Sequence, residues 1–313
     1  MDQIIVAIEV VSPVFLIIAL GYFLRYKKVI DESFIDMAMK VVFKVCLPGL
    51  LFIKVSAVDI GQVASGDSLK FILLVVIMTM ILFTIAKLYA NKFVEEAKRA
   101  TFIQGSYRSN YVIIGYTILH SLLGDAIITR MALLVIVAVP LYNVLAIWLF
   151  SEDQSKSRLQ NILTALSKVV TNPLIIAIVL GFIVAALEIR VPIILTSTIS
   201  KLGACGTPLG LIGIGGYMSF NGLFEDKDAF IATIFKVIIA PLIIVIPAYM
   251  MGYSYMDVCI LYVLFGSPAA ISSFIMASAM NGDSRLAANI VIISTASSLF
   301  TYIVGLSTIA MLY

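Results

Sequence analysis

The feature of this sequence that most restricts its fold is a series of apolar blocks, each about 20 residues long, separated by short polar connections. A block of this length can cross the hydrocarbon core of a bilayer as a helix, where every backbone polar group needs an internal partner. Of the 313 residues, 62% are apolar and 12% are charged, against about 25% charged residues in ordinary soluble domains. The sequence therefore predicts an all-α integral membrane protein.

Hydropathy read in windows of about 20 residues divides the chain into ten expected spans. They cover residues 4–24, 34–54, 70–90, 101–122, 128–150, 169–187, 193–220, 229–251, 257–280 and 286–312. Most lysines and arginines of the connections follow spans 1, 3, 5, 7 and 9, so the positive-inside rule places both termini outside the cytoplasm. We expect a multi-pass protein of the cell membrane, meaning a plasma membrane or a bacterial inner membrane.

The second half of the chain repeats proline and glycine positions of the first half at an offset of 160 residues. Three pairs of residues coincide at this offset: Pro13 with Pro173, Gly21 with Gly181, and Pro48 with Pro208. Each copy holds five spans, and because five is odd the second copy enters the membrane from the opposite side, as in the inverted repeats of secondary transporters. We expect residues 1–155 to form the first repeat and residues 156–313 to form the second.

Two of the expected spans carry polar interruptions. Span 4 contains the string GSYRSNYVIIGY, with Arg108, Ser109 and Asn110 near its middle. Span 9 contains GSPAAISSF, in which a proline removes a backbone donor. Irregular backbone at membrane depth is tolerated only inside protein or along a wet cavity, so both spans are expected to break and cross in the interior. The expected break positions are Gly105, Ser109, Pro268 and Ser273.

Crossed, broken spans predict an anion site. The N-termini of two half-helices would point at one spot near the membrane midplane, where their partial positive charge suits a carboxylate. The amide of Asn110 can both donate and accept hydrogen bonds, and Ser273 is its counterpart in the second repeat. Capping of the broken helices is a competing role for these side chains, and the two roles are compatible. The predicted substrate-binding residues are Arg108, Ser109, Asn110, Asn143, Ser272 and Ser273.

Two cations within the spans have open roles. Arg108 could clamp a carboxylate bidentately, or it could serve the structure by reaching toward the membrane surface. Lys236, near one end of span 8, is expected to reach the surface or to pair with an acid.

The residues that several classes of function require are not present in the required pattern in this sequence. The single histidine, His120, and the lack of an acidic cluster with ligand spacing argue against a metal site, and neither a cofactor nor a nucleic-acid partner is expected. An integral-membrane enzyme would need clustered aspartates or a histidine near the surface, whereas the acidic pairs here lie beside lysines in loops. We therefore expect no enzymatic activity. A channel or a membrane sensor stays open, and saturation of the flux would argue against a channel.

A series of strings occurs along nearly the whole chain in a specific order. They are PVFLIIALGYFLR, CLPGLLF, SNYVIIGY, VPLYNVLAIW, KVIIAPL, SPAAISSFIMA and NGDSRLAANIVIIST. In this order the chain resembles the auxin efflux carrier family, particularly its bacterial members labelled malate permeases. That family is related to the bile acid and sodium symporter superfamily.

The resemblance implies ten transmembrane helices in two inverted five-helix repeats, with broken helices 4 and 9 crossed. Spans 3–5 and 8–10 would form a transport unit, and spans 1, 2, 6 and 7 would form a scaffold. The transport unit would slide past the scaffold as an elevator, and the scaffold commonly forms a homodimer interface. Asn110 matches the crossover asparagine that touches the substrate. Plant auxin exporters carry proline where this chain has Ser109 and Ser273, and their long cytoplasmic loop is absent. These differences favour a small carboxylate over auxin.

Together these observations predict a secondary transporter of small organic anions, malate-like or auxin-like, that works by export or exchange. An anion leaving a negative interior gains about 2.3 kcal/mol per charge per 100 mV, so export needs no coupled ion. Coupling to a proton on Glu9, or to sodium held by carbonyls and serines, stays open. The alternative is a sodium-coupled organic anion symporter of the bile acid symporter type.

Overall fold

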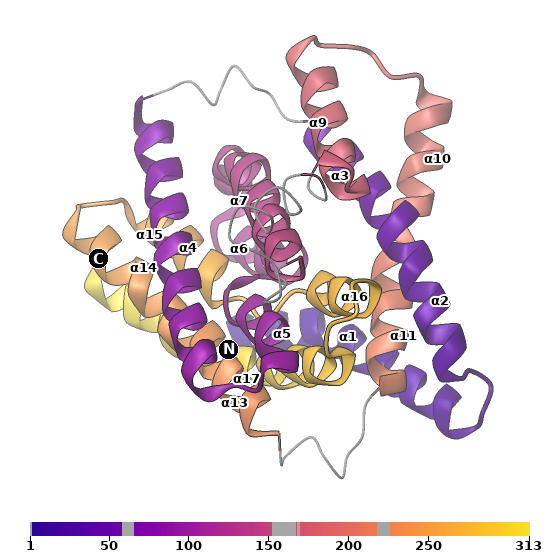
Figure 1. Cartoon of the computed structure of the whole chain (residues 1–313). Helices are drawn as coiled ribbons and strands as arrows, with labels where there is room; N and C mark the ends of the chain where they lie inside the picture. Colours follow the sequence, from indigo (N-terminus) through magenta and orange to yellow (C-terminus); the bar gives the residue numbers. More distant parts are fainter. Residues whose placement is uncertain (1, 58–65, 152–166, 168–169, 218–225) are drawn as a thin grey trace.

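The computed structural model describes residues 2–57, 66–151, 167, 170–217 and 226–313 (Figure 1). In these ranges the regular structure is helical, apart from one isolated antiparallel bridge between Ser109 and Ala269. The expectation of an all-α protein is therefore confirmed. The expected boundary between the two repeats, at residues 155 and 156, lies outside the described residues.

The first half of the chain begins with α1 (Asp2–Tyr26), α2 (Glu32–Val41), the π-helical turn η1 (Val42–Cys46), α3 (Leu47–Ser56) and α4 (Gly66–Phe93). It continues with α5 (Glu96–Tyr107), the π-helical turn η3 (Tyr111–Gly115), α6 (Tyr116–Leu123), the 3₁₀ turn η4 (Gly124–Ile127) and α7 (Ile128–Leu149). Asp31 caps α2 by accepting a hydrogen bond from the Phe34 N–H at 2.8 Å. The wide turn η1 precedes Pro48, which has no N–H to continue the α-helical ladder.

The second half forms α9 (Pro173–Ala186), α10 (Ile193–Ala204), α11 (Gly206–Tyr217), α13 (Lys227–Ile234), the π-helical turn η5 (Phe235–Ile239) and α14 (Ala240–Met250). It ends with α15 (Tyr255–Gly266), α16 (Ile271–Ala279) and α17 (Ser284–Leu312). Asn172 and Asp283 cap α9 and α17 by accepting hydrogen bonds from the first turn at 2.9 and 2.8 Å.

Glycines bring several of these helices into close contact. Gly215 of α11 lies against Ile18 of α1, where an added methyl group would overlap the Ile18 carbonyl. A Cβ on Gly203 of α10 would be 2.9 Å from the backbone nitrogen of Leu50 in α3, and Gly181 of α9 faces α3 in a similar way. Small residues allow membrane helices to approach closely, because van der Waals packing drives their association. In Figure 1, α2, α3, α9, α10 and α11 accordingly lie together on the right.

Single helices long enough to cross a membrane are few in this structure. Among the described residues, Ser68–Phe93 and Lys227–Met250 are long and apolar enough. The helices Ser284–Ser298 and Phe300–Leu312 are bent by 45° relative to each other and reach that length only if they are taken together as one span. The regions of expected spans 2, 4, 7 and 9 are each divided among shorter helices. Large apolar side chains such as Ile193 and Phe300 are exposed on the outer surface, as expected where lipid is the solvent. The count of ten spans stays a prediction.

Candidate functional site

The polar segments of spans 4 and 9 meet in the interior of the molecule. Helix α5 ends at Tyr107 and α15 ends at Gly266, and the extended residues after them run antiparallel. The Asn110 N–H donates to the Pro268 carbonyl at 2.9 Å, and the Ala270 N–H donates to the Arg108 carbonyl at 3.2 Å. These bonds supply partners for backbone groups that the two breaks remove from their helices.

The breaks lie at Ser109 and Pro268, and two of the expected break positions are wrong. Gly105 lies inside α5, and Ser273 lies inside α16. A Cβ at Gly105 would be 2.7 Å from Cδ1 of Ile290, so this glycine serves the close approach of α17 and its weak helix propensity is overridden by packing. In span 9 the break follows from Pro268, because the residue before a proline avoids the helical conformation, and Ser267 has φ −60° and ψ 148°.

Arg108 is buried at the crossing, with 5% of its surface exposed, and does not reach the membrane surface. Its Nη2 donates to Oδ1 of Asn143 in α7 at 2.9 Å, and its Nη1 lies 2.6 Å from the Met276 sulfur. The Asn143 amide is held in turn by its own donation to the Val139 carbonyl at 2.8 Å. When the Gln104 amide is oriented so that its nitrogen donates to the Ser273 carbonyl at 3.2 Å, its oxygen accepts from Arg108 Nη1 at 3.3 Å. These contacts fix the guanidinium without neutralising its charge.

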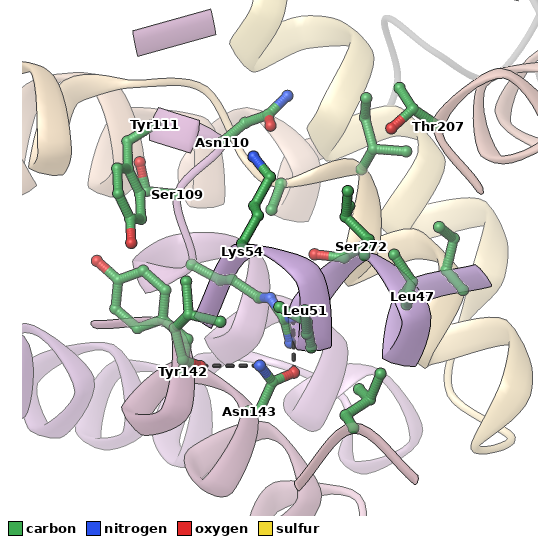
Figure 2. Close-up of a pocket in the computed structure, with 17 residues that line it drawn as sticks. Leu47, Leu51, Lys54, Ser109, Asn110, Tyr111, Tyr142, Asn143, Thr207 and Ser272 are labelled. Atoms are coloured by element: carbon green, nitrogen blue, oxygen red, sulfur yellow. Dashed lines mark hydrogen bonds between the residues drawn. The ribbon is translucent and has the colours of Figure 1, made fainter. Parts of the chain in front are cut away.

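A cavity of about 100 Å³ lies beside the crossing (Figure 2). This is several times the roughly 10–15 Å³ that a single water molecule needs. Four of its apolar side chains come from α3 and α16, namely Leu47, Leu50, Leu51 and Ile275. Its polar side chains are Lys54, Arg108, Ser109, Asn110, Tyr111, Tyr142, Asn143, Thr207 and Ser272.

The cavity brings most of the predicted binding residues together. Arg108, Ser109, Asn110, Asn143 and Ser272 line it, whereas Ser273 does not. Successive side chains of a helix point in different directions, so α16 presents Ser272 to the cavity and turns the next residue away. The hydroxyl oxygens of Ser109 and Ser273 are both buried without a hydrogen-bond partner among the described residues.

Lys54 is a cavity residue that is absent from the predicted binding residues, because from the sequence it is only a charge at the last position of expected span 2. The missed signal is helical spacing: Leu47, Leu50, Leu51 and Lys54 follow one another at intervals that share one face of α3. Figure 2 shows the Lys54 side chain extending toward Asn110. In the described part of the chain, neither Lys54 nor Arg108 forms an ion pair with an acid.

Two helix starts add to the positive potential of this cavity. The turn η3, which continues into α6, begins at Tyr111, and α16 begins at Ile271; both residues line the cavity. Unpaired N–H groups at such starts carry partial positive charge. No group of three histidine, cysteine, aspartate or glutamate side chains within the described ranges is arranged to hold a metal ion. The geometry is therefore suited to a small anion with an apolar part.

Comparison with known proteins gives the family. Residues 6–305 match the family described as membrane transport protein. The uncharacterized transporter YfdV of Escherichia coli strain K12 is 21% identical to this chain over 303 residues, which cover 93% of this chain and 95% of that protein. The YfdV proteins of Escherichia coli O157:H7 and Shigella flexneri match with the same identity and coverage. Because the family match extends over nearly the whole chain, this chain belongs to the membrane transport protein family, the family of the auxin efflux carriers.

Proposed function

We propose that this transporter carries small organic anions and that the cavity at the crossing is its substrate site. The observation that carries the proposal is the charge of the cavity wall. Lys54 and Arg108 both line it, and neither has an acidic partner among the described residues. Arg108 is buried and Lys54 is half-buried, and removing a cation from water is costly unless an opposite charge joins it. A bound carboxylate would supply that charge.

The form of the cavity favours a short carboxylate. Its volume is about 100 Å³, and the leucines of α3 would contact the carbon skeleton of a ligand. Lys54 and Arg108 come from different helices, so a malate-like dicarboxylate would offer one carboxylate to each cation. Asn110 and Ser272 add hydrogen-bonding groups that can orient the ligand. An auxin-like aromatic acid, with a single carboxylate, is the second candidate substrate.

We propose alternating access by an elevator movement within ten spans arranged as two inverted repeats. Spans 1, 2, 6 and 7 form the scaffold in this proposal, and the close packing of α3 with α9 and α10 supports that grouping. Lys54 then belongs to the scaffold, whereas Arg108 and Asn110 move with the transport unit. The movement would withdraw Lys54 from the anion and ease its release. A homodimer joined through the scaffold, in the cell membrane with both termini outside the cytoplasm, completes the proposal.

The electrical driving force favours export or exchange. An anion that leaves a negative interior gains about 2.3 kcal/mol per charge per 100 mV, and uptake of a dicarboxylate would have to overcome about twice that. The competing proposal is sodium-coupled uptake. It rests on the Ser109 and Ser273 hydroxyls, because broken transporter helices coordinate sodium with such oxygens and with unwound carbonyls. Glu9, the proton site considered from the sequence, belongs to α1, and its side chain lies outside the described part of the structure.

The test is charge movement in liposomes that contain the purified protein, with a panel of short mono- and dicarboxylates. The matched variant is Asn110→Ala, which removes a polar group from the cavity wall and leaves both cations in place. We expect saturable currents that depend on an outwardly directed anion gradient and are strongly reduced in the variant.

Three outcomes would count against the proposal. Currents that rise linearly with anion concentration would indicate a channel. Flux that occurs only with a sodium gradient would establish the sodium-coupled alternative. If no carboxylate gives a current, and thermal unfolding shows that the protein is folded, the protein is not an electrogenic carrier of these anions.

A further inference from the structure

Lys236 is a buried cation that lies outside the substrate cavity. It belongs to η5, in the middle of a predicted crossing helix, and none of its surface is exposed. Its Nζ donates to the Phe265 carbonyl, in the last turn of α15. The expectation that Lys236 reaches the membrane surface or pairs with an acid is therefore wrong, because the described residues include no ion pair of this lysine.

The position of Lys236 follows from two prolines. Pro241 lacks the N–H that would continue the helix, and the π-helical turn η5 precedes it. Pro268 helps to end α15, which leaves the final carbonyls of that helix without intrahelical partners. Gly266 of α15 packs against Pro241, where an added Cβ would lie 3.4 Å from the proline ring. The two irregular segments are thus side by side, and the ammonium reaches the end of α15.

The surroundings of this helix end favour a cation. The last carbonyls of a helix carry partial negative charge. The carbonyl of Val263 already accepts from the Ser267 N–H at 2.9 Å and from its hydroxyl at 2.6 Å. The Tyr302 hydroxyl donates to the Ser267 oxygen at 2.7 Å, so the neighbouring hydroxyls are committed to one another. The ammonium of Lys236 is the charge that remains for the Phe265 carbonyl.

The C-terminal ends of broken helices are the places where secondary transporters coordinate their coupling cations. We infer that the Lys236 ammonium is a tethered cation that occupies this place at the end of α15, so that the carrier cycle requires no sodium there. The part of this inference that concerns flux rests on the proposed function, and the part that concerns cation binding does not. Lys236 is a positioning residue in this account, since it acts on the crossing through α15 and does not line the cavity.

The first experiment measures thermal unfolding of the purified wild-type protein in sodium chloride and in choline chloride at equal ionic strength. We expect the same Tm in both salts. A saturable rise in sodium, of about 2–5 °C for an ion present at roughly ten times its Kd, would overturn the inference if it persists in Ser109→Ala and Ser273→Ala, which remove the other candidate sodium ligands. This measurement does not require a known substrate, so it stands even if no carboxylate is transported.

The second experiment replaces the tethered cation by a free one. Lys236→Ala leaves room beside the Phe265 carbonyl. We expect sodium or methylammonium to raise the Tm of this variant by about 2–5 °C. If the wild type transports carboxylates, we also expect these cations to restore transport by the variant. Lys236→Met fills the same space with an apolar chain, and it should show neither response. Lys44→Ala, at an exposed lysine of η1, is the matched control for removal of a lysine from a π-helical turn.

The two variants separate a cation site from a purely structural lysine. If methylammonium and sodium affect Lys236→Ala no more than Lys44→Ala, the inference is wrong and Lys236 only caps α15. If Lys236→Ala cannot be purified, the wild-type comparison of sodium and choline, together with sodium-free flux of the wild type, still decides the question.

Discussion

Substitution of Asn143 separates the contribution of buried Arg108 to protein stability from its contribution to anion binding. Asn143 accepts a hydrogen bond from Arg108 at 2.9 Å, and both side chains are nearly fully buried. Asn143→Leu removes the acceptor and leaves the guanidinium short of one partner, which costs about 1.5–3 kcal/mol for a hydrogen bond to a charged group. We expect the Tm in detergent to fall by about 3–10 °C.

Asn143→Asp should have the opposite effect on stability and a severe effect on binding. The carboxylate takes the place of the amide oxygen, so Arg108 gains an ion pair with the same geometry and the Tm should not fall. The same carboxylate would repel a bound anion. At a separation of about 5 Å and an effective dielectric constant near 20, this repulsion is about 3 kcal/mol, which weakens the Kd for an anion by about 100-fold.

The assay is a pair of measurements on each variant: thermal unfolding in detergent, and the substrate concentration that gives half-maximal current in liposomes. Asn143→Leu should lose stability and keep a measurable anion response, whereas Asn143→Asp should keep stability and lose the response. If the aspartate variant transports carboxylates with the affinity of the wild type, then the charge of Arg108 does not act on the substrate.

Two further predictions follow from the same cavity and from the crossing. Lys54→Met should raise the anion concentration for half-maximal current by about 10-fold or more, because a charge-assisted contact is worth about 1.5–3 kcal/mol, without lowering the Tm. The exposed Lys40→Met is its control, and equal behaviour of the two variants would remove Lys54 from the site. Gly105→Ala should lower stability by about 1–3 kcal/mol, since its Cβ would lie 2.7 Å from Ile290 Cδ1. Ile290→Val, which removes the Cδ1 methyl group, should restore part of the lost stability in thermal unfolding, and a Gly105→Ala protein as stable as the wild type would refute the packing argument.

Sequence reasoning located the crossing because polarity in an apolar span has few explanations. Arg108, Ser109 and Asn110 cannot face lipid, so a buried site followed from their position alone. Pro268 marked the second break for an equally local reason, the loss of a backbone donor. Gly105 was misjudged because a glycine that weakens a helix and a glycine that admits a neighbouring helix look the same in a sequence. Only its contact with Ile290 tells them apart.

The residues missed by sequence reasoning are those whose role depends on distant partners. Lys54 is far from Asn110 along the chain, and the cavity exists because α3 packs beside the crossing. The choice of Ser272 over Ser273 depends on the rotation of α16, which the packing of that helix sets and which no local pattern reveals. Lys236 resembled a surface-seeking lysine until the end of α15 was located beside it.

The sequence by itself determined that this chain is a helical membrane protein and that two of its spans are interrupted. Both conclusions depend on the transfer of backbone and side-chain polar groups out of water, which is a property of short segments. The tertiary structure decided which cations share the cavity, which serine faces it, and where Lys236 donates its hydrogen bond. These outcomes depend on the rotation and approach of helices that are distant in the chain, and packing at the level of single methyl groups sets that geometry.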